Sequence, residues 1–561
     1  MLPALPALKP EIAHLFEKHR EVLNAAVKAL KDRTFYAQWP EMPKAYGDDT
    51  GKAPFDAQLG QPFTRLKQSQ DTQLLADEYS PYTREKLNIT YPAFKDVDEY
   101  VAYSQKGFES WRRTDAATRT ALLIESLFRM QQDFFEIAYA TQHTTGQSFM
   151  MSFQASGPHA ADRALEAVAL GYEELTRFPG QITWEKPMGK VNAVLHKQYR
   201  AVPLGVSLAI GCSTFPVWNS LPGIYASLIT GNSVIVKPHP LGIYSIALVV
   251  GRLQEVLEEY GFDPHTVLLA PDTVEHPLTK NLAEHPHVKI IDFTGGSAFG
   301  LYVEELPGKV TFTEKAGVNS VILDSAVELK PVLDNLAFSV SLYSGQMCTA
   351  PQNFFLPKTG MKIGGQQVSA EEVINAFVEN VKGLATHEKV GPAVCGAVQS
   401  QATLDRIAKA KSLGAKVLLE SQPIPNPEFP NAQTASPIIL QVDAAQRDLY
   451  EHEHFGPIVF VVLTDSTDHS IQLAHDLAQQ KGAISCAAYT TEPATLHKIA
   501  DAMSDAATSV AFNLTGGVYV NQNAGFSDFH VTGGNPAGNA SFTDPEFVAK
   551  RFNYVGLRIN A

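Results

Sequence analysis

The sequence predicts an α/β protein whose two lobes are each built on a doubly wound parallel sheet. The chain has 561 residues and 45% of them are hydrophobic, which is enough to bury more than one core. From residue 206 onward, short apolar segments alternate with segments of helical periodicity. Strands separated by helices are typical of parallel sheets with helices on both faces, and such sheets bind ligands at the carboxyl ends of their strands.

The first 200 residues predict a helix, an irregular segment, further helices and a β-prone stretch. Apolar residues recur at helical spacing from Pro10 to Leu30, which indicates a docked structural helix. Residues 34–95 are rich in Pro, Gly, Asp, Gln and Tyr with little periodicity, so we expect a long irregular wrap over the main body. Residues 97–175 have a helical pattern, and residues 181–199 are polar and β-prone.

Strands and helices then alternate in two stretches. In the first, we expect strands at 206–210, 233–236, 267–269 and 288–291, and helices at about 216–230 and 243–260. In the second, which spans about 318–520, we expect helices at 370–385 and 401–413 and strands near 416–419 and 457–463.

The composition argues against several classes of protein. The formal net charge of -14 argues against a nucleic-acid or anionic-membrane partner, because either would need a basic face. The four cysteines form no Cys-x-x-Cys pair, so we expect neither a zinc site nor a disulfide scaffold. So few cysteines in a chain of this length also favour a reducing compartment. The apolar start has no basic leader region, and no apolar run is long enough to span a bilayer. We therefore expect a soluble cytoplasmic protein.

Cys348 is the candidate nucleophile and Glu314 the candidate base. Cys348 ends the run Ser-Gly-Gln-Met-Cys, and Glu314 lies 34 residues earlier in Thr-Glu-Lys-Ala-Gly, so only the fold can bring them together. A thiolate is the best nucleophile that a protein has near neutral pH, and a carboxylate can activate the water that clears a covalent intermediate. Taken alone, the pattern also fits a buried cysteine with a packing role.

Three residues are candidates for cofactor binding at strand ends. Gly295 and Gly296 follow a strand, where glycines let backbone N–H groups approach a phosphate. Their spacing differs from the standard dinucleotide fingerprint, and a tight turn without a ligand is the alternative. Lys237 also ends an apolar strand, where it could hold a ribose hydroxyl or a phosphate, or simply terminate the strand at the surface.

Two further segments carry polar side chains near expected strands. Thr214 could donate a hydrogen bond to an oxyanion and Phe215 could form a pocket wall, although an N-cap role is the alternative for Thr214. Glu453 lies in Glu-His-Glu-His-Phe-Gly-Pro, and we interpret it as a carboxylate turned toward a ribose. The His-x-His of this run lacks an obvious third ligand, so we expect no metal site.

The motifs, taken in order, resemble those of the aldehyde dehydrogenase superfamily over roughly residues 97–540. They are Ser-Thr-Phe-Pro (213–216), Thr-Gly-Asn (230–232), Val-Lys-Pro (236–238), Phe-Thr-Gly-Gly (293–296), Glu-Lys-Ala-Gly (314–317), Gly-Gln-Met-Cys (345–348) and His-Phe-Gly-Pro (454–457). Two longer runs, 344–354 and 526–539, are similar to bacterial phenylacetate-degradation aldehyde dehydrogenases with an N-terminal extension.

The resemblance implies a fold and a domain organisation. It implies two parallel-sheet lobes, a β-arm that joins subunits and an N-terminal helical extension. The implied parts are the extension (1–96), a cofactor-binding lobe (97–315) with an arm segment at about 181–203, a catalytic lobe (316–537) and a C-terminal oligomerisation segment (538–561). A homo-oligomer, either a dimer or a dimer of dimers, is the implied assembly.

The resemblance also implies a reaction and residue roles. Cys348 would attack a small-molecule aldehyde, hydride would pass to NADP or NAD, and Glu314 would activate the water that releases a carboxylate. Lys237 would contact the adenosine ribose, Gly295 and Gly296 the pyrophosphate region and Glu453 the nicotinamide ribose, with Phe455 also at the cofactor. The phenylacetate resemblance points to a semialdehyde linked to coenzyme A (CoA).

The sequence departs from the family pattern at two positions. The usual asparagine that donates to the oxyanion is here Thr214, and Asn219 would need a shifted backbone to replace it. The glutamate that often follows the lysine by three residues, and grips the ribose 2′-hydroxyl, is here Pro240. Losing that carboxylate removes repulsion toward a 2′-phosphate, so we expect NADP, with NAD as the alternative.

Two other functions remain open from the sequence. A CoA-acylating aldehyde reductase would use a thiol in place of water, and it would not need Glu314 as a water-activating base. A thioester or lactone hydrolase, or a binding protein without dehydrogenase activity, is the second alternative, and Thr214 is the residue that favours it.

Overall fold

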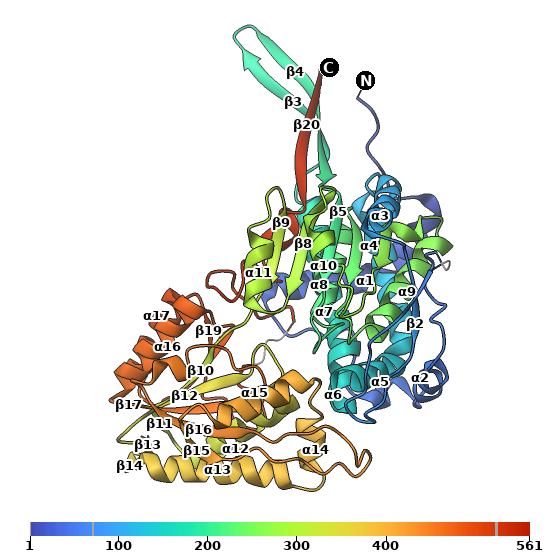
Figure 1. The fold of residues 1–561 in the computed structure, drawn as a ribbon. Coiled ribbons are helices and arrows are strands. Elements are labelled where there is room, and N and C mark those ends of the chain that lie inside the picture. The colour runs from blue at the N-terminus through green and yellow to red at the C-terminus, as the bar shows by residue number, and fades with distance from the viewer. Residues whose placement is uncertain (1, 70–71, 522–524) are drawn as a thin grey trace.

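The computed structural model describes residues 2–69, 72–521 and 525–561. It forms two α/β lobes, each around its own sheet, and a narrow three-stranded arm that extends away from them (Figure 1). The predicted fold class is thus confirmed.

The first lobe is built on a five-stranded parallel sheet with strand order β7-β6-β5-β8-β9. Its strands β5, β6 and β7 are short, mostly apolar and buried along their whole length, as expected for a parallel sheet. α8 and α9 cover one face, with α4 and α7 beyond them, and α3, α10 and α11 cover the other. The strands are β5 (Val206–Ile210), β6 (Ser233–Lys237), β7 (Val267–Leu269), β8 (Val288–Thr294) and β9 (Val310–Glu314). The helices are α3 (Val97–Trp111), α4 (Ala116–Met130), α5 (Phe134–Thr145), α6 (Phe149–Gln154), α7 (Ala160–Thr176), α8 (Ser220–Ile229), α9 (Tyr244–Glu259), α10 (Thr279–Glu284) and α11 (Ser297–Glu304).

The second lobe is built on a seven-stranded sheet with order β15-β16-β17-β12-β10-β18-β19, in which only the edge pair β15–β16 is antiparallel. α12 and α13 pack on one face, and α15, α16 and α17 on the other. The strands are β10 (Asn319–Leu323), β12 (Pro351–Pro357), β15 (Lys416–Leu419), β16 (Ile438–Asp443), β17 (Ile458–Thr464), β18 (Ser485–Tyr489) and β19 (Ser509–Phe512). The helices are α12 (Leu329–Ser341), α13 (Ala370–Thr386), α14 (Val390–Cys395), α15 (Gln401–Lys411), α16 (Thr467–Lys481) and α17 (Pro493–Asp505).

One predicted helix boundary is wrong. Pro216 is a favourable first residue for a helix, but residues 216–219 form turns and α8 begins only at Ser220. The other expected helices and strands of both stretches are present, with ends that differ by at most a few residues.

The arm is an antiparallel sheet with order β20-β4-β3. Its strands are β3 (Gln181–Met188), β4 (Val191–Pro203) and β20 (Phe552–Asn560), which joins the C-terminus to the β-prone stretch (Figure 1). Several apolar side chains of the arm are exposed, among them Met188, Val191, Tyr554 and Val555.

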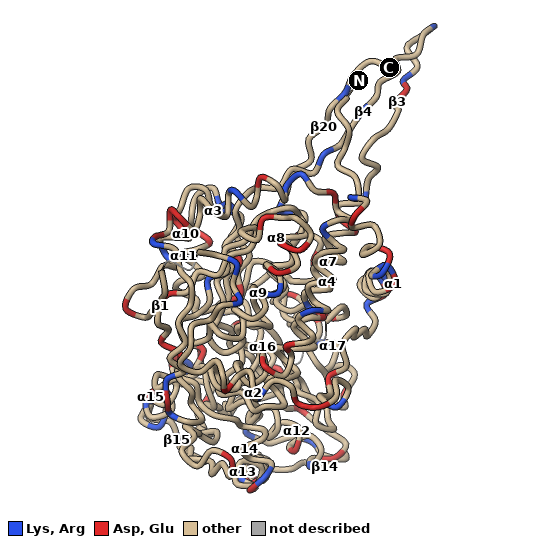
Figure 2. Tube along the Cα trace, turned by 90° about the vertical axis from the view of Figure 1, so that its right-hand side faces the viewer, with Lys and Arg blue, Asp and Glu red and all other residues tan. Residues whose placement is uncertain are grey.

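The N-terminal segment wraps the first lobe. α1 (Pro10–Asp32) packs on α4 and α7, and residues 34–95 are mostly irregular, as predicted. The described part of that stretch contains only α2 (Lys52–Gln58), a short 3₁₀ turn (Pro43–Tyr46) and the pair β1 (Thr72–Leu75) and β2 (Thr90–Ala93). Basic and acidic residues are interspersed along the whole chain (Figure 2). No helix among the described residues is both long and apolar enough to cross a membrane.

A buried ion pair joins the base of the arm to the first lobe. Arg551 is fully buried, and its guanidinium donates to both carboxylate oxygens of Asp292 on β8, at 2.7 and 2.5 Å. We expect Arg551→Met to destabilise the protein by about 3–5 kcal/mol, because Asp292 would keep a largely buried charge without its partner. Unfolding followed by circular dichroism measures the change.

Arg558→Met is the matched control, because Arg558 is exposed on β20, the strand that follows Arg551. The double variant Arg551→Met/Asp292→Asn should recover much of the lost stability. Equal stability of the Arg551 and Arg558 variants would contradict this account.

Candidate active site

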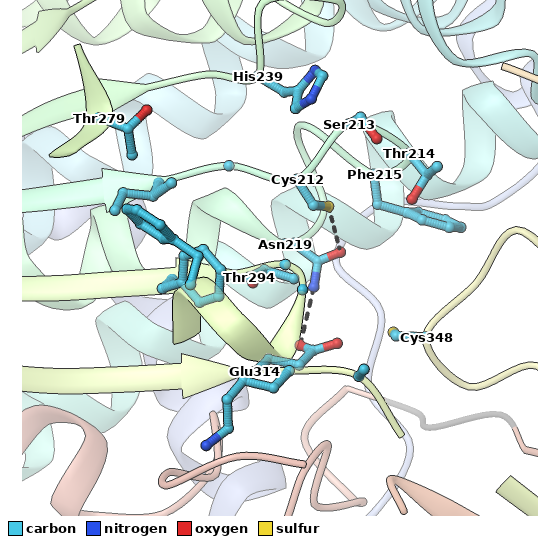
Figure 3. Close-up of a pocket in the computed structure, with 18 of the residues that line it drawn as sticks. Cys212, Ser213, Thr214, Phe215, Asn219, His239, Thr279, Thr294, Glu314 and Cys348 are labelled. Carbon is cyan, nitrogen blue, oxygen red and sulfur yellow. Dashed lines mark hydrogen bonds between the residues drawn. The ribbon is translucent and has the colours of Figure 1, made fainter. Parts of the chain in front are cut away.

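Two cavities meet at the predicted nucleophile. The first, of about 680 Å³, lies at the carboxyl ends of β5, β6, β8 and β9 (Figure 3). The second, of about 420 Å³, lies between α6 and residues of the second lobe. Cys348, Asn219 and Phe215 line both cavities. A reactant in either cavity can therefore reach Cys348.

Cys348 lies on a tight loop that the fold holds in an unusual backbone conformation. Tyr343, Ser344 and Gly345 all have positive φ angles of 51°, 47° and 60°. A Cβ on Gly345 would lie 2.5 Å from the Gly456 oxygen, so only glycine fits there. The hydroxyl of Ser344 donates to two backbone carbonyls, and the Gln346 amide donates to two others. The predicted Ser-Gly-Gln run is thus the scaffold of this loop.

The thiol of Cys348 is neutral in the resting protein. Burial, and after it the charge of the nearby Glu314 carboxylate, raises the pKa of Cys348 well above its usual value. Sγ lies within 4.8 Å of a carboxylate oxygen of Glu314 and of a ring nitrogen of His530. The nucleophile therefore needs a base to remove its proton, and Glu314 lies beside it.

Glu314 is a fully buried carboxylate that binds partners on one oxygen only. Its Oε2 accepts a hydrogen bond from Asn219 Nδ2 at 3.1 Å and lies 3.2 Å from His530 Nε2. Its Oε1 is buried without a hydrogen-bond partner among the described residues. Burial by itself raises the pKa of Glu314, but His530, Cys348 and Arg163 together lower it by more, so the carboxylate is held charged.

A loop from the C-terminal segment fixes the strand end that carries Glu314. Lys315 N donates to Ala537 O at 2.6 Å, and Thr313 N donates to Asn539 Oδ1 at 2.7 Å. Gly538 packs so closely on this strand that a Cβ would lie 2.5 Å from Thr313 O. The run Asn-Pro-Ala-Gly-Asn, singled out in the sequence for its resemblance, thus positions the base.

His530 is held by aromatic side chains. Its ring meets Trp218 edge-on at 5.0 Å and stacks on Phe542 at 5.6 Å between ring centroids. The Arg163 guanidinium lies over both of those rings, at 4.7 and 5.2 Å. This packing restricts the ring of His530 and directs Nε2 toward Glu314.

The structure brings Asn219 to the predicted site more directly than Thr214. Because α8 begins late, Asn219 precedes the helix and its amide lies between Cys212 and Glu314 (Figure 3). Asn219 lines both cavities, whereas Thr214 lines only the first. Asn219 therefore lies where the two cavities meet, beside both Cys348 and Glu314.

Lys237 lies in the first cavity and is not a surface lysine. It is buried at the end of β6 and forms an ion pair with Asp272 at 2.6 Å. Burial lowers the pKa of Lys237, and Asp272 offsets part of that shift. A cofactor that contacts Lys237 would therefore meet an ammonium already held by a carboxylate.

Two further basic side chains, His239 and Lys280, line the same cavity as Pro240. Burial, helped by Lys237, lowers the pKa of His239 to about 4, so its ring is neutral near pH 7. The Lys280 side chain is 65% exposed at the edge of the same cavity. Lys280 can therefore offer a charge to an anion here, whereas His239 can offer only a hydrogen bond.

The remaining predicted cofactor residues also line the first cavity. Gly295 and Gly296 lie between β8 and α11. Glu453 and Phe455 lie on the opposite wall, in the loop before β17, where Arg406 Nε donates to Phe455 O at 2.8 Å. Burial raises the pKa of Glu453 to about 7, so its carboxyl group titrates near neutral pH.

One group of side chains could hold a metal ion. The ligand atoms of Glu314, Cys348 and His530 lie within 4.8 Å of one another, and they differ from the His-x-His run weighed in the sequence. A thiol, an imidazole and a carboxylate suit zinc. The same three groups also suit a nucleophile with its base, and the two cavities that meet there favour that second interpretation.

Four residues of the site were missed or discounted in the sequence. Asn219 was discounted on the helix boundary, Asp272 lies in a loop without periodicity, and Lys280 lies on the short helix α10, which was not predicted from the sequence. His530 was quoted only within the run Phe-Ser-Asp-Phe-His, where nothing in the spacing relates it to Glu314, 216 residues earlier. Each becomes visible only when distant segments meet in the fold.

Comparisons with known proteins agree with this geometry. The model of the aldehyde dehydrogenase family matches residues 67–540. The crystal structure of an NAD-dependent aldehyde dehydrogenase from Burkholderia multivorans superposes with a TM-score of 0.95 and 42% identity, covering 98% of this chain and 99% of that one.

More distant relatives are similar over part of the chain. A putative aldehyde dehydrogenase of Gibberella fujikuroi is 27% identical over 387 residues, which are 68% of this chain and 75% of the relative. An alpha-ketoglutaric semialdehyde dehydrogenase of Bacillus subtilis is 24% identical over 68% of this chain and 75% of its own length. With a family match over most of its length and a near-complete structural relative, this chain belongs to the aldehyde dehydrogenase family.

Proposed function

We propose that this protein oxidises an aldehyde to a carboxylate with NADP or NAD, through a covalent intermediate on Cys348. The observation that carries this proposal is the meeting of two cavities at a cysteine whose thiol lies beside a buried, charged carboxylate. One cavity takes the dinucleotide and the other takes the aldehyde. The placement of Glu314 favours hydrolysis by water over transfer to CoA.

The first step forms a bond between sulfur and carbon. The Cys348 thiol passes its proton to Glu314, whose Oε1 has no other partner among the described residues, and sulfur adds to the carbonyl carbon. The carbonyl oxygen becomes an oxyanion and needs hydrogen-bond donors. A nicotinamide held in the first cavity would supply the acceptor for the hydride that leaves this carbon, and loss of that hydride would leave a thioester on Cys348.

The second step releases the product. Glu314 first releases to solvent the proton that it took from Cys348, and it can then take a proton from water. The water oxygen adds to the thioester carbon, the carbon–sulfur bond breaks, and the departing sulfur takes the proton from Glu314. The products are the carboxylic acid and the regenerated thiol. Asn219 and His530 hold Oε2 throughout, so that the other carboxylate oxygen faces the reacting groups.

Asn219 is our proposed side-chain donor to the oxyanion, in place of Thr214. One hydrogen of its Nδ2 is used by Glu314, which leaves the second hydrogen of the same amide. Its Oδ1 lies 3.6 Å from Cys212 Sγ, which favours the orientation with Nδ2 toward Glu314. Thr214 is the alternative donor from the sequence.

The first cavity fits a dinucleotide in size and lining. A volume of about 680 Å³ lies within the range of cofactor sites. We propose that Lys237 holds the adenosine ribose, that Gly295 and Gly296 lie at the pyrophosphate, and that Glu453 and Phe455 lie at the nicotinamide ribose. Pro240 and the nearby Lys280 favour a 2′-phosphate, and hence NADP. The relative from Burkholderia multivorans is described as NAD-dependent, so NAD is retained as the alternative.

The substrate and the assembly are proposals at a finer level. Resemblance to phenylacetate-degradation enzymes with an N-terminal extension makes a CoA-linked semialdehyde one candidate substrate. We also propose a homo-oligomer, a dimer or a dimer of dimers, in which the apolar side chains of the arm are covered. Four free cysteines fit a reducing, cytoplasmic location.

Cys348→Ala and Glu314→Gln test the proposed reaction. We expect Cys348→Ala to abolish formation of reduced nicotinamide, and Glu314→Gln to give little turnover, because thioester hydrolysis lacks its base. A stopped-flow burst at the reduced-nicotinamide absorbance, with hexanal and with a CoA-linked semialdehyde, separates the steps. Cys395→Ala is the control, because Cys395 is buried outside both cavities. Full activity of Cys348→Ala would refute the proposal.

Asn219→Ala and Thr214→Ala separate the two candidate oxyanion donors. Removing one such donor typically lowers kcat by about 10²–10³. We expect a loss of that size for Asn219→Ala, and a loss below about tenfold for Thr214→Ala. Asn219→Asp reports on the Glu314 contact, because it adds a like charge beside the base. A larger loss for the Thr214 variant would return the role to that residue.

Lys280→Met tests the preference for NADP. We expect the KM for NADP to rise about three- to tenfold and the KM for NAD to change little, because only NADP carries the 2′-phosphate. Steady-state kinetics with both cofactors measures the ratio. Lys289→Met, a partly exposed lysine outside the cavity, is the control. Equal changes in KM for both cofactors would show that Lys280 does not interact with the 2′-phosphate of NADP.

A further inference from the structure

The N-terminal segment reaches the second cavity at Glu41. This residue belongs to the irregular wrap, yet it lines the cavity together with His159 and residues of α6. The His159 ring nitrogen Nε2 lies 3.0 Å from Glu41 Oε1. Their side chains are 37% and 51% exposed, so the pair marks the mouth of the cavity and not its floor.

Two aromatic anchors hold the backbone on either side of Glu41. Trp39 is 1% exposed, and its indole donates to Gln131 Oε1 at 3.0 Å. The ring of Tyr46 packs on Phe134 at 5.4 Å and on Phe153 at 5.6 Å. Glu41 therefore occupies a fixed place, although the segment that carries it is mostly irregular.

The other side of the mouth is fixed by a distorted helix. Between α6 and α7 the chain forms a π-helical turn (Ala155–His159) that contains Pro158. Gln154 and Ala155 line the cavity, and His159 ends the turn at the mouth. The hydrogen bond with His159, which outweighs the effect of burial, lowers the pKa of Glu41. The mouth thus carries a carboxylate that is charged at neutral pH.

The interior of this cavity is apolar and lacks strong cations. Its walls include Met150, Met151, Trp218, Phe338 and Met347. None of the described residues that line it is lysine or arginine. A carboxylate or phosphate carried into it would lose water without meeting a paired charge, which is costly.

We propose that the N-terminal segment forms one wall of the aldehyde entrance, and that Glu41 there disfavours aldehydes with a negative charge at their far end. The inference rests on the proposed function, in which this cavity takes the aldehyde. Its substrate class is a neutral aldehyde with an apolar aliphatic or aromatic chain. A CoA thioester would have to keep its phosphates outside the mouth, beyond Glu41.

Two aldehydes of equal length test the proposal. Hexanal is neutral, and 6-oxohexanoate carries a terminal carboxylate. For each enzyme, kcat/KM for 6-oxohexanoate is divided by kcat/KM for hexanal. We expect Glu41→Gln to raise this ratio by about three- to tenfold, which is the effect of removing one repulsion between exposed charges. Glu41→Lys should raise the ratio further, and added salt should shrink the difference between wild type and variants. Asp48→Asn is the control, because Asp48 is an exposed acid of the same segment outside the cavity.

A binding measurement keeps the test independent of turnover. Hexanamide and adipic acid monoamide differ by the same terminal carboxylate, and each can protect Cys348 from iodoacetamide, with peptide masses reporting the modified cysteine. We expect Glu41→Gln to improve protection by the anionic amide relative to hexanamide. Unchanged ratios in both experiments would overturn the inference. Shifted protection without any aldehyde oxidation would instead refute the proposed function and the assignment of this cavity to an aldehyde, and it would leave only the exclusion of anions at the mouth by Glu41.

Discussion

A buried negative charge on Glu314 is the constraint on which the rest of the site depends. A carboxylate with no solvent contact is unfavourable unless the protein replaces the lost water. Here the replacement comes from the Asn219 amide, the His530 ring and, at longer range, the Arg163 guanidinium. Because two of these partners bind the same oxygen, the other oxygen is left for chemistry. The same contacts that stabilise the buried charge of Glu314 therefore also orient its carboxylate.

The same constraint explains why the site needs the whole chain. Glu314 ends a strand of the first lobe, Cys348 lies on a loop of the second, and His530 comes from the C-terminal segment that also closes on the strand of Glu314. Neither lobe by itself holds both the thiol and its base. Residues of both lobes line the two cavities, so in the proposed reaction the cofactor and the aldehyde would approach Cys348 from different sides.

The N-terminal segment illustrates how an irregular stretch can carry function. It has few regular elements, but the buried Trp39 and the packed Tyr46 fix its path against α5, the turn before α5, and α6. A charged side chain between those anchors is placed as firmly as one on a strand. Loops held in this way are common sites of specificity, because the rigid lobe beneath them is left unchanged.

The sequence by itself determined the fold class, most of the strands and helices, and the pair Cys348 and Glu314. Short apolar runs such as 206–210 and 267–269, which alternate with helical patterns, predict buried strands, and the motifs around the cysteine and the glutamate can be recognised without knowledge of the fold. The tertiary structure alone decided that α8 begins at Ser220, which brings Asn219 to Glu314. It alone paired Lys237 with Asp272 and His530 with Glu314. The physical reason is that periodicity in the sequence records only which face of a helix or strand is buried. These contacts join strand ends and loops that are far apart in the chain, and no periodic pattern relates their side chains to one another.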